Sequence, residues 1–225
     1  GGNVALLSGD AMLITAYKLL AKVSSERLPK VMSIFSDMAL EVCEGQQYDM
    51  DFETMPKVSV EEYMQMIERK TSALLSGSAM IGATMAGAAE EDIKKIYRFA
   101  TELGLAFQLQ DDVLDSFGDT ALGKKIGGDI LEGKKTYLMI TAMSRATDEQ
   151  REILRTTHLR NDISDEEKIA CIKQLYDTLG VPAMTEQQIA VRIARATAVL
   201  DTLDIPTERT LVLKSYFEGL AGRNK

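Results

Sequence analysis

The sequence contains no tryptophan and only four prolines, and aromatic residues make up 6% of its 225 residues. Strand-rich proteins favour aromatic and β-branched residues, whereas segments rich in Ala, Leu, Met, Glu and Lys recur throughout this chain and favour helices. The composition therefore predicts an all-α fold and gives an all-β fold little support. With 45% hydrophobic residues, the chain can bury a substantial core, and we expect residues 1–225 to form one domain.

Cysteine is also scarce, and no signal peptide or run of about 18 apolar residues is present. Cys43 and Cys171 lie far apart in sequence, each on an apolar helical pattern. We interpret both as buried small hydrophobic residues rather than as a disulfide, metal ligands or nucleophiles. These absences predict a cytoplasmic protein with no stable membrane insertion.

Positive charge is the minority sign, because 26 lysines and arginines face 34 aspartates and glutamates, for a formal net charge of −8. No polybasic or aromatic-interleaved basic stretch is present, so nucleic acid is not expected to be a partner. An acidic protein that binds an anionic substrate needs divalent cations or a local group of lysines, because its overall field repels the ligand.

Hydrophobic periodicity predicts a single bundle of about eight helices. The segment from Gly9 to Ala21 is apolar almost all round, which is typical of an interior helix. A second helix is expected from Ser24 or Ser25 to about Tyr48, and a long one from Glu90 to Ser116. Four capping boxes predict later helix starts, at Ser59/Glu62, Thr147/Gln150, Ser164/Glu167 and Thr185/Gln188.

The strongest local signal is the run of carboxylates within Phe107–Asp115. On a helix, Gln108, Asp111 or Asp112, and Asp115 recur at intervals that place them on one face. Like charges at this spacing repel one another, and apolar neighbours indicate partial burial. Such a cluster requires a cation to offset its charge.

Oxygen ligands without nearby histidine or cysteine indicate a hard cation, and Mg²⁺ commonly uses one or two carboxylates together with waters and substrate phosphates. An acidic surface stripe that pairs with lysines of another helix would show the same DDxxD pattern. The motif alone leaves both interpretations open.

The residues that follow favour the metal site. Residues 119–135 form a glycine-rich stretch that contains four lysines, including Lys124, Lys125 and Lys134, and another carboxylate, Asp129. Glycines let backbone N–H groups approach phosphate oxygens, and lysines bind them as point charges. A solvated basic loop would explain the lysines but not their position directly after the carboxylates.

Two further polar pairs interrupt apolar helical patterns. Lys70 and Thr71 lie within one such pattern, and Gln46 with Asp49 closes the second helix. From the pattern alone, both pairs are better explained as ordinary boundary residues of amphipathic helices.

Several motifs together resemble the polyprenyl synthase family, the trans-isoprenyl diphosphate synthases of the farnesyl and geranylgeranyl diphosphate synthase type. They are Leu6-Leu-Ser-Gly-Asp10, Gly45-Gln46-x-x-Asp49, Arg69-Lys70-Thr71, Phe107-Gln108-x-x-Asp111-Asp112-x-x-Asp115, Gly123-Lys124-Lys125-Ile126-Gly127-Gly128-Asp129-Ile130 and Glu132-Gly133-Lys134-Lys135-Thr136. Each motif is weak by itself, whereas the order and spacing of the set are highly specific.

The resemblance implies a helical bundle of the isoprenoid synthase type that forms a homodimer. It also implies a Mg²⁺-dependent prenyltransferase that condenses an allylic diphosphate with isopentenyl diphosphate. Metal ions would lie at Asp111, Asp112 and Asp115, the second aspartate-rich motif of the family, with support from Asp129, Asp49 and Gln46. Lys70, Lys134 and one of Lys124 and Lys125 would contact the diphosphate, and Thr71, Phe107 and Gln108 would line the site.

One departure from the family pattern is large. The first DDxxD motif and the basic elements that bind isopentenyl diphosphate should precede Gly1, so the chain resembles the C-terminal two-thirds of a synthase. We expect these residues alone to be inactive. The alternatives are a non-catalytic or regulatory helical subunit, and a related class I terpenoid enzyme, against which the Gly-Lys loop and Lys70-Thr71 argue.

Overall fold

A computed structural model describes residues 1–118 and 126–221, and these residues form helices joined by short connections, with no strand among them. The α-helices are α1 Gly2–Leu20, α2 Leu28–Thr54, α3 Val60–Ile67, α4 Ala73–Ala86, α5 Glu90–Phe117, α6 Gly128–Glu132, α7 Tyr137–Arg145, α8 Asp148–Thr156, α9 Asp165–Thr178, α10 Val181–Leu200 and α11 Thr207–Ala221. A π-helical turn, η1 (Glu68–Ser72), joins α3 to α4, and a 3₁₀ turn, η3 (Thr157–Leu159), follows α8.

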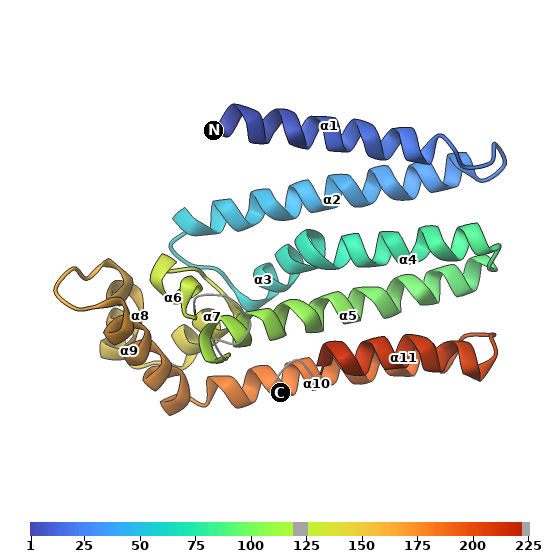
Figure 1. Cartoon of the computed structure of the whole chain (residues 1–225). Helices are drawn as coiled ribbons and strands as arrows, with labels where there is room; N and C mark the ends of the chain where they lie inside the picture. The colour runs from blue at the N-terminus through green and yellow to red at the C-terminus, as the bar shows by residue number, and fades with distance from the viewer. Residues whose placement is uncertain (119–125, 222–225) are drawn as a thin grey trace.

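The long helices lie side by side, and the shorter helices α6 to α9 gather at one end of them (Figure 1). Helix α5 is central, because α4 packs against one side of it and α10 against another, while α2 packs against α4. The C-terminal ends of α2 and α5 point toward the end of the bundle where the short helices gather (Figure 1). The predicted all-α bundle is confirmed, with more helices than the eight expected because several are short.

Local sequence signals account for most helix starts. Three of the predicted capping boxes are present, at Ser59, Thr147 and Ser164. The prediction at Thr185 is wrong, since Thr185 lies buried inside α10 and its hydroxyl donates to the carbonyl of Val181. Helix α10 begins instead after Gly180, whose φ of 71° suits glycine, and has proline in its first turn.

The two long helices α2 and α5 test the predicted boundaries. The predicted helix from Glu90 to Ser116 is confirmed as α5. Helix α2 begins at Leu28 rather than near Ser24, and continues to Thr54, beyond Tyr48. The sequence offers no helix breaker after Tyr48 until Pro56, so the helix continues while hydrogen bonding allows.

Helix α1 does not occupy the interior position that its apolar sequence predicts. It has no buried residue, and Leu6, Leu7 and Met12 are among its exposed side chains. Its C-terminal half contacts α2, where the ring of Tyr17 packs edge-on against Phe35.

The prediction that both cysteines are buried is wrong for Cys43, which is exposed on α2. Cys171 is partly buried, and both cysteines are free thiols. No helix in residues 1–118 or 126–221 combines the length and apolar character needed to cross a membrane.

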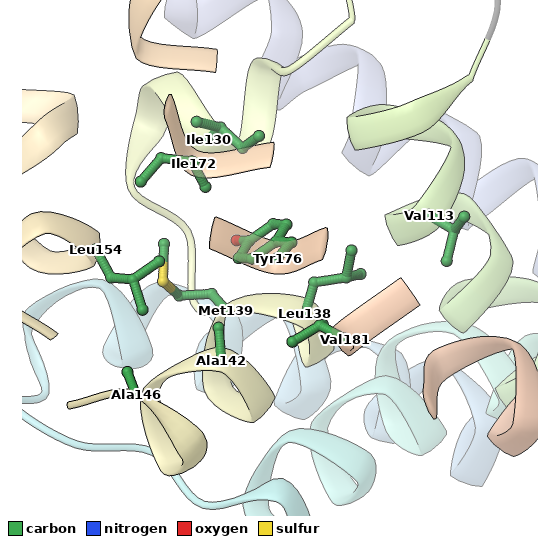
Figure 2. Close-up of a cluster of buried hydrophobic side chains, with 10 residues drawn as sticks. All are labelled: Val113, Ile130, Leu138, Met139, Ala142, Ala146, Leu154, Ile172, Tyr176 and Val181. Carbon is green, nitrogen blue, oxygen red and sulfur yellow. The ribbon is translucent and has the colours of Figure 1, made fainter. Parts of the chain in front are cut away.

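Two buried clusters fix the end of the bundle that holds the site. The first cluster lies among the short helices and the adjoining ends of α5 and α10, and contains Val113, Ile130, Leu138, Met139, Ala142, Ala146, Leu154, Ile172, Tyr176 and Val181 (Figure 2). The second cluster joins α2, α3, α5 and α7 and contains Phe52, Val58, Tyr63, Met66, Ile67, Leu105, Leu109, Tyr137 and Ile140. The burial of these side chains stabilises the ends of α2 and α5 in fixed positions relative to α6 and α7.

Candidate functional site

A cavity of about 770 Å³ opens where the C-terminal ends of α2 and α5 meet α3, α6 and α7. Its polar lining brings together acidic and basic side chains from distant parts of the sequence, namely Asp49, Lys70, Gln108, Asp111, Asp112, Asp129 and Lys134. Its apolar lining includes Met66, Ile67, Met139 and Ile140. Concave sites with an apolar wall and a few convergent polar groups are typical of small-molecule binding.

The π-helical turn η1 places Lys70 at this cavity, and a glycine makes its position possible. A Cβ atom on Gly45 would lie 2.7 Å from the Cα atom of Lys70. On the opposite side, a Cβ atom on Gly104 would lie 2.6 Å from the Cα atom of Ser72. Glycine at both positions lets α2 and α5 approach the turn closely. Single π-turns inside helices occur frequently at functional sites.

Lys70 pairs with Asp49 across the gap between η1 and α2. The lysine Nζ lies 2.6 Å from Oδ2 of Asp49, and both side chains are partly exposed. Two residues that the sequence pattern explained as helix boundaries therefore form an ion pair at the cavity. Because the pair is not sealed from solvent, an incoming anion can exchange for the carboxylate as the partner of Lys70.

Asp112 is the fully buried member of the DDxxD motif, and its two oxygens accept three hydrogen bonds. The hydroxyl of Tyr63 and the backbone N–H of Tyr137 donate to Oδ2, and Nε2 of Gln108 donates to Oδ1 at 3.2 Å. Thr71 extends the network, since its hydroxyl donates to Oε1 of Gln108 at 2.9 Å. The network connects η1, α3, α5 and α7 behind the cavity wall.

Burial raises the pKa of Asp112 from 3.8 to about 7, although the hydrogen bonds from Tyr63 and Gln108 oppose the shift. Burial also raises the pKa of Tyr63 well above its ordinary value, and the neighbouring carboxyl of Asp112 adds to the effect. Desolvation dominates in both residues because it penalises the charged form. Tyr63 therefore remains a hydrogen-bond donor throughout the physiological range.

Asp111 and Asp115 occupy the same face of the last turns of α5, as the spacing predicts. Asp111 is part of the cavity lining, whereas Asp115 lies one turn further along α5 and is not. Oδ2 of Asp115 accepts a hydrogen bond of 3.0 Å from the backbone N–H of Asp129, at the start of α6. Burial raises the pKa of Asp115, and this hydrogen bond lowers it in part. The carboxylate stripe thus adjoins the lysine-bearing segment directly.

Lys134 lies on that segment, shortly after α6. Its Nζ lies 2.9 Å from Oδ1 of Asp129 and 3.0 Å from Oε2 of Glu132. Burial lowers the pKa of Lys134, but the hydrogen bonds to the two carboxylates outweigh burial and raise it overall. Lys134 therefore remains an ammonium ion at any physiological pH, facing the cavity from the side opposite α2.

The donor set fits Mg²⁺ in the way that this ion usually binds. Asp111 and Asp129 present carboxylates to the cavity, with Asp115 beside them. No three His, Cys, Asp or Glu side chains in the described ranges are close enough to form a metal cage by themselves. Mg²⁺ typically takes one or two carboxylates and completes its shell with waters and substrate phosphates. Lys70 and Lys134 line the same cavity, and their ammonium groups suit those phosphates.

The remaining predicted site residues lie less directly at the cavity. Thr71 reaches it only through Gln108, and Phe107 and Gln46 are not part of its lining. Gln46 is exposed on α2, one turn before Asp49. Lys124 and Lys125 lie outside the described residues.

Tyr63, Lys135 and His158 are among the cavity residues that have no role assigned from the sequence. Tyr63 follows the Ser59 capping box on an apolar helical face, so its pattern resembles that of a core residue. His158, the single histidine, packs over Gly133, whose Cβ would lie 2.7 Å from the imidazole. Lys135 belongs to a family motif in which the resemblance assigns a role to Lys134 alone. The packing of segments that are distant in sequence brings Tyr63, Lys135 and His158 to the cavity.

The fold and the site define a class of protein: an all-α bundle with a cavity that faces carboxylates toward lysines above an apolar wall. A model of the polyprenyl synthetase family matches residues 1–178. The chain belongs to this family.

A short chain isoprenyl diphosphate synthase of Methanocaldococcus jannaschii is 40% identical over 169 residues, which make up 74% of this chain and 51% of that protein. A solved geranylgeranyl pyrophosphate synthase matches 99% of this chain and 69% of its own length, with a TM-score of 0.92 and 38% identity.

The geranylgeranyl pyrophosphate synthase of Corynebacterium glutamicum, solved in complex with isoprenyl diphosphate and magnesium, matches with a TM-score of 0.86 and 32% identity. The match covers 99% of this chain and 62% of that one. This chain spans about half the length of the curated relatives it matches.

Proposed function

We propose that this chain supplies the allylic-diphosphate side of a Mg²⁺-dependent prenyltransferase. The reaction condenses an allylic diphosphate with isopentenyl diphosphate to make a longer trans-polyprenyl diphosphate. The observation that carries the proposal is the juxtaposition of Asp111 and Asp129 with Lys70 and Lys134 around one cavity that also has an apolar wall. The names of the related proteins support the same reaction.

In this proposal Lys70 and Lys134 bind the diphosphate from two sides, with Lys124 or Lys125 as a third contact. Asp111 and Asp115 would hold Mg²⁺, and Asp129 and Asp49 line the same cavity, where they could accept hydrogen bonds from waters of its shell. We assign Asp112 a supporting role, because both of its oxygens already accept hydrogen bonds from Tyr63, Gln108 and the backbone of Tyr137. Gln108 lines the wall beside the allylic group, and Thr71 holds it there through the hydrogen bond to Oε1 of Gln108.

The lysines act on the bond that breaks. As the allylic carbon–oxygen bond lengthens, negative charge grows on the leaving diphosphate, and the ammonium groups of Lys70 and Lys134 stabilise it. Bound Mg²⁺ would neutralise further charge on the same oxygens. The double bond of isopentenyl diphosphate attacks the allylic cation, and a proton then passes to the released diphosphate. Apolar residues such as Met66 and Ile140 exclude the water that would quench the cation.

Calorimetry with inorganic diphosphate, with and without Mg²⁺, tests the site. We expect binding that requires Mg²⁺ and that is lost in the double variant Asp111→Ala with Asp115→Ala. The matched control is Asp10→Ala with Glu26→Ala, which removes two exposed carboxylates far from the cavity. Metal-dependent binding that survives in the Asp111/Asp115 variant would show that the site is assigned to the wrong residues.

We further propose that the 225 residues by themselves turn over negligibly. The sequence holds one DDxxD motif, and a transition state with charge on a whole diphosphate requires stabilising groups on more than one side. Removal of one preorganised group typically costs about 3 kcal/mol or more of transition-state stabilisation. Diphosphate binding without turnover is therefore the expected behaviour of this chain.

A homodimer is the proposed assembly, and the exposed apolar side chains of α1 support it. Val4, Leu6, Leu7, Met12 and Ile14 are all at least three-fifths exposed, and patches of this kind commonly mark interaction surfaces. Sedimentation equilibrium measures the assembly directly. A monomer at micromolar concentration, with no change after Leu7→Ser and Met12→Ser, would rule out this interface.

A further inference from the structure

We infer that Lys135 is a positioning residue that ties the two walls of the cavity together. The inference rests on the proposed function, since it concerns the geometry in which diphosphate binds. Although Lys135 belongs to the lysine-bearing segment, its ammonium group is directed at the backbone of another helix. Its Nζ donates to the carbonyl oxygen of Phe52 at 2.5 Å and to that of Glu53 at 3.1 Å. Both carbonyls lie in the last turn of α2.

The C-terminal end of α2 has backbone carbonyl groups that a cation can satisfy. The last carbonyl groups of a helix lack partners within the helix and form the negative end of its dipole. The last turn of α2 contains no basic residue and instead carries Asp51 and Glu53. The carbonyl of Asp51 accepts hydrogen bonds from Met55 and Thr54. Lys135, from more than 80 residues away, serves the next two carbonyls.

The neighbours of Lys135 give this contact its consequence for the site. Immediately before it, Lys134 pairs with Asp129 on the α6 side of the cavity. Immediately after it, Thr136 caps α7 by accepting a hydrogen bond from Met139. The helix that Lys135 caps carries Asp49, one turn earlier, which pairs with Lys70. One ammonium group therefore joins the wall that contains Asp49 and Lys70 to the wall that contains Lys134.

Burial lowers the pKa of Lys135, with a smaller opposing effect from Glu53. Its hydrogen-bond partners are two backbone carbonyls. Lys134 differs, because its partners are carboxylates at the cavity that an incoming anion can replace.

The first arm of the test is hydrogen exchange on the whole chain without ligand. Lys135→Met keeps the aliphatic stem and removes the ammonium group, Lys135→Arg restores two donors, and Lys22→Met controls for the loss of an exposed lysine. We expect Lys135→Met to accelerate exchange of the amides of residues 52–54 roughly tenfold or more, since a hydrogen bond to a charged group contributes at least that factor. Lys135→Arg should restore slow exchange. Unchanged exchange in Lys135→Met would overturn the inference.

The second arm measures Mg²⁺-dependent affinity for inorganic diphosphate in the same variants. We expect Lys135→Met to weaken binding roughly 10- to 100-fold, as is typical when a supporting group is lost, and Lys135→Arg to recover most of it. In a Lys70→Met background, Lys135→Met should weaken binding less than about threefold. The α2 wall that Lys135 positions has then already lost the ammonium group of Lys70, which binds the diphosphate.

The outcomes separate the two proposals. If the effects of Lys135→Met and Lys70→Met on the free energy of diphosphate binding were fully additive, Lys135 would be a direct phosphate ligand. That result would overturn the positioning role. If the wild-type chain bound no diphosphate in Mg²⁺, the proposed function would fail. The exchange arm would then still decide whether Lys135 joins the two walls.

Discussion

Replacement of Asp112 by asparagine should change how the stability of the chain depends on pH. Asp112 is 3% exposed, and burial raises its pKa from 3.8 to about 7. Below a pH of about 4 the carboxyl is protonated in both the folded and the unfolded chain. As the pH rises toward 7, the unfolded chain loses this proton first, so the group contributes progressively less stability. Above a pH of about 7 the loss is complete.

The magnitude follows from the size of the shift. Each unit of pKa difference between the folded and unfolded states corresponds to about 1.4 kcal/mol. The Asp112 pKa is raised by about three pH units, so the free energy of unfolding should fall by about 4 kcal/mol as the pH rises from about 4 to about 8. An asparagine side chain does not titrate, so Asp112→Asn should remove this loss.

The network around Asp112 can accept an amide in place of the carboxyl. The amide oxygen can take the hydrogen bonds from Tyr63 and the backbone of Tyr137, and the amide nitrogen can donate to Gln108 once that side-chain amide turns over. Thr71 donates to Gln108 in the wild type, and its hydroxyl can reverse and accept instead. The substitution should therefore leave the fold intact.

Urea unfolding of both proteins across this pH range, followed by circular dichroism in the presence of a chelator, measures the effect. The informative quantity is the difference between wild type and variant, because other carboxylates contribute equally to both. Asp162→Asn is the control of opposite sign, since Arg160 lowers the pKa of Asp162 to about 2. A wild-type-minus-variant difference that stays constant from pH of about 4 to 8 would refute the assignment of Asp112 as a buried, desolvated carboxyl.

Three further predictions concern helix contacts, caps and turnover. Gly45→Ala should destabilise the chain by about 3 kcal/mol or more, because the added Cβ would collide with the backbone of Lys70. Its control, Gly82→Ala on α4, places the Cβ in open space and should stabilise the chain by about 0.5 kcal/mol. Thermal unfolding of the two variants tests the close approach of α2 to η1. Thr147→Ala should cost about 1 kcal/mol through loss of the α8 capping box, while Thr178→Ala, an exposed hydroxyl within α9, should cost much less in the same measurement. An assay with labelled isopentenyl diphosphate, an allylic diphosphate and Mg²⁺ should show no product above background with this chain, and robust product would require a second metal-holding group within these residues.

Local signals predicted those parts of the fold that depend on neighbouring residues in sequence. The capping boxes at Ser59, Thr147 and Ser164, and the extent of α5, follow from hydrogen bonds and side-chain periodicity within one helix. The error at Thr185 arose because the same residue spacing occurs inside a helix, where the hydroxyl bonds to the preceding turn. The stronger start signal was Gly180 followed by proline.

Long-range contacts could not be read from spacing. The pairing of Lys70 with Asp49 and the bonds from Lys135 to the end of α2 join segments 21 and more than 80 residues apart. The sequence also could not distinguish the roles within the DDxxD motif. Burial and hydrogen bonding separate Asp112, which faces Tyr63, from Asp111, which faces the cavity.

The central claim is that this cavity binds an allylic diphosphate through metal and lysines, and equilibrium dialysis with a labelled allylic diphosphate tests it most directly. Wild type should bind one equivalent in Mg²⁺ and none in a chelator. Lys70→Met with Lys134→Met should abolish the binding, whereas Lys22→Met should leave it unchanged. Binding of the same strength in the chelator, or in the Lys70/Lys134 variant, would contradict the account.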